Sequence, residues 1–223
     1  MKKIILLSLI IAFAIGLNAQ TSKKDFSPAF VSAMQANIKQ LDTAVTAATL
    51  ITVANNFERI ANSEKTKWEP FYYAAYSYTI MAFMSPDKTK IDWLADKAEG
   101  LLQQAAAIEK NNSEISVMFA MINSCRIMVD PVSRFQTRGP EIQSLLAKAT
   151  QENVNNPRIY LQQARMQIRT PEAFGGGKIA AKKSTETAIE KFKNFTPENS
   201  IAPAWGESQA ISLLEKLMQA INQ

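Results

Sequence analysis

The sequence has no histidine, a single cysteine and only seven glycines among its 223 residues. The absence of histidine excludes His-ligated zinc, an imidazole base, a Ser-His or Cys-His nucleophile pair and a histidine pH switch. A single cysteine excludes an internal disulfide. A chain of this length, 47% hydrophobic, can bury a sizeable core without metals or cross-links. These absences favour a binding or assembly role over catalysis.

Charge of one sign is not concentrated in any part of the chain. The 25 Lys and Arg residues are interspersed with 20 Asp and Glu residues, which gives a net charge of +5. In the most basic stretch, Lys182 to Lys193, Glu186 and Glu190 fall between the lysines at helical spacing. This pattern is typical of a solvated helix face. Nucleic acid is therefore not expected as a partner.

No group of residues indicates catalysis, a metal or a cofactor. The carboxylates fall at expected helix ends or on polar faces, where they stabilise the helix dipole without any reaction. We therefore expect a protein that is not an enzyme, with no metal and no cofactor. An enzyme that uses converging carboxylates, or serine and lysine, stays open as a third alternative.

The N-terminus has the three parts of a secretory signal peptide. Two lysines follow Met1, an apolar run covers residues 4–17, and cleavage is expected near Ala19. The run is shorter than the ~20 residues that span a membrane, and no cysteine follows it for lipid attachment. We predict a signal peptide over residues 1–19 and a single periplasmic or secreted domain over residues 20–223, without stable membrane insertion.

Apolar residues recur at helical spacing almost throughout the rest of the chain. Ile91, Leu94 and Ala98 are one example, and no stretch shows the strict alternation of a β-strand. Proline and glycine residues separate the periodic runs. The sequence predicts an all-α protein with helices near 28–42, 44–62, 69–84, 88–109, 113–129, 140–152, 157–169, 177–194 and 203–221.

The helical pattern repeats with a period of 44 residues. Leu101 and Ala105, followed by an Asn-Asn pair, correspond to Leu145 and Ala149, which are followed by a second Asn-Asn pair. A single helical hairpin cannot cover its own apolar faces, whereas stacked hairpins form one continuous core. We therefore expect an α-α superhelix of about four hairpins plus a C-terminal capping helix.

The repeat resembles the tetratricopeptide (TPR) superfamily, although its period exceeds the ~34 residues of the standard unit. The closest likeness lies in residues 155–210, where Pro171-x-x-Phe-Gly-Gly-Gly is followed by Pro203-x-Trp-Gly. This order is similar to a group of exported bacterial TPR-like proteins and, more distantly, to the T component of tripartite (TRAP) periplasmic transporters. The resemblance implies a TPR-like solenoid without an assigned reaction.

The glycine-rich turn is predicted to be structural. Gly175, Gly176 and Gly177 permit positive φ between two closely packed helices, and Phe174 is expected to fold onto the hairpin as a plug. A phosphate-binding loop is excluded because Ile179 stands where the motif requires a hydroxyl.

Two places in the sequence supply candidate partner-binding residues. Tyrosines in the 69–84 helix offer apolar area with a polar tip, and the expected turn at 132–138 places two arginines around an aromatic residue, which suits a carboxylate. Ordinary core packing is the alternative for the aromatic residues. The candidates are Trp68, Tyr72, Tyr76, Arg134, Phe135 and Arg138.

Together these patterns predict a non-catalytic exported scaffold or adaptor. In a superhelix the first helix of each hairpin lines the concave side, where a protein or peptide segment would bind. The alternative is a ligand-binding accessory protein of a periplasmic transport system, which would hold a small apolar ligand in a groove lined by methionine and aromatic residues. Cys125 is predicted to be a buried hydrophobe.

Overall fold

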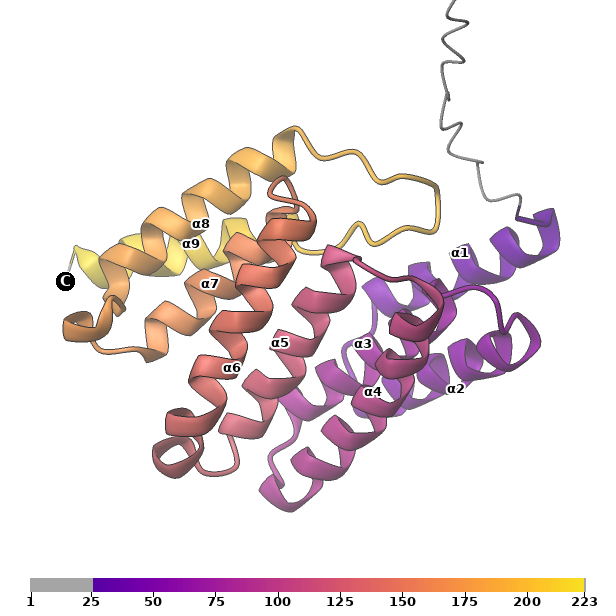
Figure 1. Ribbon diagram of the computed structural model, residues 1–223, viewed down its shortest axis with the longest axis horizontal. Helices are drawn as coiled ribbons and strands as arrows, with labels where there is room; N and C mark the ends of the chain where they lie inside the picture. The colour runs from indigo at the N-terminus through magenta and orange to yellow at the C-terminus, as the bar shows by residue number, and fades with distance from the viewer. Residues whose placement is uncertain (1–25, 223) are drawn as a thin grey trace, which may run out of the picture.

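The computed structural model describes residues 26–222, so the predicted signal peptide lies outside the described residues. Between these limits the chain is all-α, as predicted, with no strand (Figure 1). The helices are α1 (Pro28–Asp42), α2 (Ala47–Ser63), α3 (Glu69–Met84), α4 (Lys88–Ile108), α5 (Ser113–Ile127), α6 (Pro131–Glu152), α7 (Pro157–Arg169), α8 (Gly177–Lys193) and α9 (Glu207–Ile221), with a 3-10 turn at Glu172–Phe174.

Side-chain caps explain where most of the helices begin. Ser27, Thr46, Asp87, Asn112 and Asn156 each accept a hydrogen bond from a backbone N–H in the first turn of the helix that follows. Such caps satisfy N–H groups that have no partner inside the helix. These starts lie within three residues of the predicted ones.

Two predicted helix boundaries are wrong. The 132–138 segment is helical, because Asp130 caps α6 and Pro131 occupies its first position, and Pro140 is accommodated inside the helix. The last helix begins at Glu207 instead of residue 203, since Gly206 has a φ of 116° and breaks the helical backbone.

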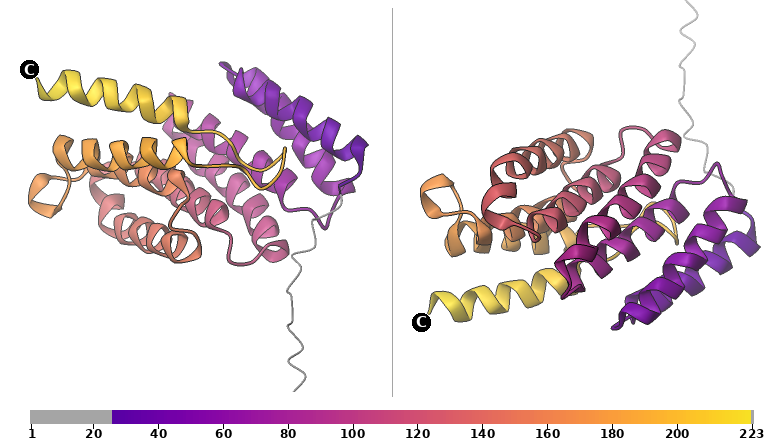
Figure 2. Two further views of the ribbon diagram at one scale, coloured as in Figure 1. Left: turned by 90° about the horizontal axis from the view of Figure 1, so that it is seen from above. Right: turned by 90° about the horizontal axis from the view of Figure 1, so that it is seen from below.

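The helices pack in chain order and form two rows. Successive helices contact one another, and contacts also join α1 to α3, α3 to α5 and α5 to α7. Helices α3, α5 and α7 therefore form an inner row, with α1 packed against α2 and α3, and α9 packed against α8 (Figures 1 and 2). The aromatic helix α3 lies in this row and is buried on almost every side, as expected for a helix that is apolar all round. Cys125 on α5 is buried too.

Several polar contacts join residues separated by about one period of the sequence pattern. Arg165 and Gln209 are bonded across 44 positions, and Arg158 and Glu114 also across 44 positions. These bonds link α7 to α9 and α5 to α7. Equivalent positions of neighbouring hairpins therefore lie side by side.

The glycine turn between α7 and α8 is built differently from the prediction in one respect. Gly175 and Gly177 have the expected positive φ, at 80° and 89°. Phe174, however, is 78% exposed, so it is not a plug. The 3-10 turn ends at Phe174 and points it outward, while the N–H of Gly177 bonds to the carbonyl of Thr170 and closes the turn. Within residues 26–222, no helix combines the length and apolar character needed to cross a membrane.

Candidate functional site

A groove of about 840 Å³ lies on the inner face of the molecule, between α1 and α9. Helices α3, α5 and α7 form its floor, with a contribution from α6. Figure 2 shows α1 and α9 on the same side of the inner row. The apolar lining residues are Ile38, Leu41, Ala44, Ile80, Phe83, Met121, Ile127, Phe135, Ile142, Met166, Ile168 and Ala204.

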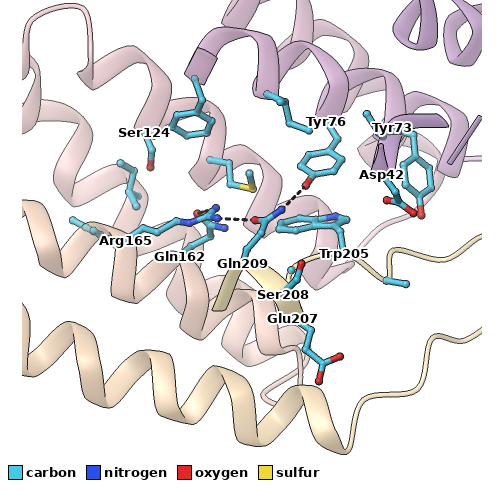
Figure 3. A pocket seen from close by; sticks show the side chains of 18 of the residues that line it. Asp42, Tyr73, Tyr76, Ser124, Gln162, Arg165, Trp205, Glu207, Ser208 and Gln209 are labelled. Atoms are coloured by element: carbon cyan, nitrogen blue, oxygen red, sulfur yellow. Dashed lines mark hydrogen bonds between the residues drawn. The ribbon is translucent and has the colours of Figure 1, made fainter. Parts of the chain in front are cut away.

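One wall of the groove is a stacked aromatic pair. The rings of Tyr76 and Trp205 are 4.6 Å apart between centroids, with an interplanar angle of 18°. The Tyr76 hydroxyl accepts a hydrogen bond of 3.5 Å from Nε2 of Gln209 (Figure 3). Burial raises the pKa of the Tyr76 phenol above its ordinary value, so this side chain stays protonated at neutral pH.

The polar side of the groove carries a positive charge without a carboxylate partner. Arg165 donates from Nη2 to Oε1 of Gln209 at 2.6 Å, and no ion pair joins it to any residue between 26 and 222. Desolvation lowers the pKa of Arg165, although a guanidinium stays charged in proteins. Arg169 lines the groove one turn later. This side of the groove therefore suits an anion.

A buried amide adds an unused donor to the same side. Gln162 is 5% exposed and lines the groove. Its Nε2 atom has no hydrogen-bond partner among the described residues. A buried donor without a partner costs free energy, and a ligand oxygen would satisfy it. The apolar walls and the α7 side of the groove together match a largely apolar molecule that carries carboxylate groups, although Asp42 and Glu207 line other parts of the groove.

A buried polar network holds the aromatic wall in place. Trp205 Nε1 donates to the Tyr72 hydroxyl at 3.0 Å, and that hydroxyl donates to Glu114 at 3.4 Å. Arg158, which is fully buried, bonds to Glu114 at 3.0 Å and to the carbonyl of Pro203 at 2.8 Å. Burial raises the pKa of Glu114, and the charge of Arg158 opposes this shift. The network ties the segment before α9 to α3, α5 and α7.

The structure divides the aromatic residues that the sequence offered as partner-binding candidates into two groups. Tyr76 and Phe135 line the groove. Trp68 and Tyr72 are buried, at 5% and 0% exposure, and neither lines this groove.

The arginine candidates make contacts within the protein. Arg134 binds both carboxylate oxygens of Asp92, at 2.6 and 2.8 Å. Arg138 bonds to Asn123 and to Glu141. Neither arginine lines the groove. The arginines that line the groove, Arg165 and Arg169, belong to α7 and not to α6.

Several residues that line the groove were not predicted from the sequence, although they lie 44 residues apart, which is the period of the repeat. Positions 44 residues apart come to lie together in the groove, because neighbouring hairpins present equivalent faces. Scanning the sequence at this period for polar residues inside apolar helices would have found Ser124, Arg165 and Gln209. Two sets of three are Met121, Arg165 and Gln209, and Ile80, Ser124 and Ile168.

No group of three or more metal-ligating side chains that could hold an ion occurs within the described part of the chain. The solved structure of the HusA haemophore from Porphyromonas gingivalis is similar to this protein. The two share 36% sequence identity and superpose with a TM-score of 0.78. The match covers 88% of this chain and 96% of the haemophore chain. No protein-family model and no curated protein matches the sequence.

Proposed function

This chain belongs to the same family as the HusA haemophore, and on that premise we propose that it is an exported, non-catalytic protein that binds haem in the groove between α1 and α9. The observation that carries the proposal is the composition of that groove. The groove has a volume of about 840 Å³ and mainly apolar walls. On its polar side, Arg165 forms no ion pair within residues 26–222, and Nε2 of Gln162 has no hydrogen-bond partner there.

The apolar part of the groove suits the porphyrin ring. Haem is a flat, mostly apolar macrocycle, and small-molecule sites typically enclose about 300–1,000 Å³ with mainly apolar lining. The Tyr76 and Trp205 pair offers a rigid aromatic wall, and Met121 and Met166 offer side chains that adapt to an irregular ligand edge. Burial of the ring against these residues supplies most of the binding free energy.

The polar side of the groove suits the two propionate groups of haem. Arg165 and Arg169 lie one turn apart on α7 and both line the groove. Side chains at this spacing are neighbours, with Cβ atoms roughly 5–6 Å apart. Each guanidinium can bind one carboxylate through paired hydrogen bonds, and Nε2 of Gln162 supplies a further donor. The propionates thereby fix the orientation of the ring.

Iron coordination by histidine plays no part, since the sequence contains none. Tyr76 is a weak candidate ligand because burial raises the pKa of its phenol, whereas coordination requires the phenolate. The thioethers of Met121 and Met166 are the other groove atoms that could approach iron. Recognition therefore rests mainly on the macrocycle and its carboxylates.

The proposed function agrees with the sequence prediction on the class of protein and differs from it on the ligand. It keeps a binding protein without catalysis, a signal peptide over residues 1–19 and a single domain over 20–223. On the concave face it places a small ligand instead of a peptide, in line with the ligand-binding alternative. A TPR-like origin of the repeats remains part of the proposal.

A haem titration tests the proposal. The purified chain is titrated with haem, and binding is followed by the Soret absorbance and by quenching of tryptophan fluorescence. We expect saturable binding, weakened at least about tenfold by the double substitution Arg165→Gln and Arg169→Gln, because each charge-assisted bond is worth about 1.5–3 kcal/mol. Iron-free protoporphyrin IX should also bind.

Arg59→Gln is the matched control, because Arg59 is an exposed arginine on α2 whose side chain forms a single hydrogen bond within residues 26–222, to Asn56. It should leave the haem affinity unchanged. The proposal fails if haem produces no saturable change, or if the double variant binds as tightly as the control variant.

A further inference from the structure

A second hollow lies at the ends of the helices, where three loops meet. The α4–α5, α6–α7 and α8–α9 loops line about 1,360 Å³ of space, and Figure 1 shows these loops at the same edge of the molecule. This loop hollow shares no lining residue with the haem groove. It therefore requires a separate explanation.

The loop hollow is acidic in a protein of net charge +5. Its charged lining residues include a single lysine, Lys191, whose ammonium bonds to Asn155. Glu114 is neutralised by the buried Arg158, whereas Glu190 and Glu198 form no ion pair within residues 26–222. The lining glutamates are Glu69, Glu109, Glu114, Glu152, Glu190 and Glu198.

One of these carboxylates is buried without adequate hydrogen bonding. The side chain of Glu152 is 7% exposed, and neither of its oxygens has a hydrogen-bond partner among the described residues. The ammonium of Lys148 lies 3.5 Å from Oε1 without forming a hydrogen bond, and it is itself 60% exposed. A buried carboxylate in this state is destabilising. A cationic group of a ligand would supply the missing donors.

Three asparagines line the loop hollow at the repeat period. Asn111, Asn155 and Asn199 follow one another at intervals of 44 residues and lie in the α4–α5, α6–α7 and α8–α9 loops. Oδ1 of Asn155 and of Asn199 already accept bonds inside the protein, whereas no Nδ2 atom of the three has a partner within residues 26–222. An amide can donate to a backbone carbonyl of a bound chain.

The spacing of these amides suits an extended peptide. Neighbouring packed helices lie about 8–10 Å apart, and an extended chain advances about 3.3 Å per residue. An extended peptide that runs across the three loops would therefore pass one asparagine side chain at about every third residue. This register leaves the intervening side chains of the peptide free to reach the glutamates.

We propose that the loop hollow binds an extended segment of a partner protein that carries lysine or arginine side chains. The asparagines bind its backbone, and Glu152 with its neighbouring glutamates binds its cationic groups. The haem groove and the partner site thus lie on different surfaces, so a loaded protein can engage its partner without giving up the ligand. This inference does not depend on the identity of the groove ligand.

Calorimetric titration of the full chain with two synthetic peptides tests the proposal. One peptide alternates lysine and serine over nine residues, and the other has glutamate in place of lysine. At low ionic strength we expect saturable binding of the lysine peptide only, with affinity that falls as salt is added. Glu152→Gln should weaken it about tenfold, as expected for loss of a buried charged partner, and Glu198→Gln should weaken it less.

The control is Glu215→Gln, which removes an exposed carboxylate of α9 outside the loop hollow. Thermal unfolding monitors the folding of every variant, and the haem titration of Glu152→Gln should match wild type. The proposal is overturned if the lysine peptide does not bind, if Glu152→Gln and Glu215→Gln behave alike, or if Ca²⁺ or free lysine displaces the peptide at equal concentration. Failure here with normal haem binding leaves the haem proposal intact.

Discussion

The indole Nε1 of Trp205 donates a hydrogen bond to the hydroxyl of Tyr72, 3.0 Å away and 133 positions earlier in the chain. Tyr72 is fully buried in α3, whereas Trp205 forms a wall of the groove by stacking on Tyr76. The same hydroxyl donates to Glu114. The position of a groove residue is therefore set by a polar contact inside the core.

Tyr72→Phe should both destabilise the protein and weaken haem binding. The substitution removes the acceptor for a buried indole N–H, which costs about 1–3 kcal/mol when left unsatisfied, and it frees Trp205 to move. Urea unfolding measures the first effect, and the haem titration measures the second. Tyr160→Phe is the control, since the Tyr160 hydroxyl makes an exposed bond to Val154. Equal behaviour of the two variants would contradict the role given to Tyr72.

Local signals in the sequence were sufficient to predict most of the helices. Caps such as Asn112 and Asn156 and the breaks at proline act over a few residues, so they can be recognised without a structure. Apolar residues on all sides of α3 indicated packing on more than one face, but they left open which of its tyrosines are buried. The 44-residue period also indicated which helices would be neighbours, because equivalent hairpins stack in series.

The groove could not be predicted from the sequence, because it forms where the packed helices leave part of their surface uncovered, and this depends on the tertiary structure. Nothing local marks Arg165 as lacking a carboxylate, since pairing depends on side chains brought close by packing. Trp205 lies in the segment before α9, whose path is fixed by the distant Arg158 and Tyr72. Phe174 was misjudged for a similar reason, because the direction of a 3-10 turn decides its exposure.

The thiol of Cys125 should be unreactive in the folded protein. Burial raises its pKa well above the ordinary value, so the nucleophilic thiolate is scarce at neutral pH. We expect no reaction with a disulfide reagent in native buffer, and one thiol per chain after denaturation. Rapid labelling of the native protein would show that α5 opens locally, since the thiol contacts the carbonyl of Thr79 in α3.

The ion pair between Arg134 and Asp92 should contribute stability at neutral pH that is lost in acid. The hydrogen bonds from Arg134 lower the pKa of Asp92 from its ordinary value. A carboxyl group with a lowered folded-state pKa stabilises the protein above the unfolded value, and this contribution disappears as the pH falls through the folded value. Both side chains are partly exposed, at 32% and 39%, so screening limits the contribution to at most about 1 kcal/mol.

Arg134→Gln should therefore lower the unfolding free energy at pH 7. The difference in unfolding free energy between the variant and wild type should shrink as the pH falls through the folded-state pKa of Asp92. Urea unfolding at a series of pH values measures this. Arg59→Gln serves again as the control and should show no such convergence. A difference between Arg134→Gln and wild type that stays constant across the series would mean that packing of the arginine, and not its charge, stabilises α6.

The turn between α7 and α8 should tolerate changes at Phe174 and Gly175 better than at Gly176. A Cβ at Gly176 would lie 2.0 Å from the backbone carbonyl of Thr170, which cannot move without breaking the turn. We expect Gly176→Ala to cost about 2–3 kcal/mol. Gly175 has positive φ but open space, so Gly175→Ala should cost about 1 kcal/mol from backbone strain alone. Phe174→Ala should change stability by less than about 0.5 kcal/mol because the ring is exposed. If Phe174→Ala proved the most destabilising of the three in thermal unfolding, the ring would have to pack on the hairpin in solution.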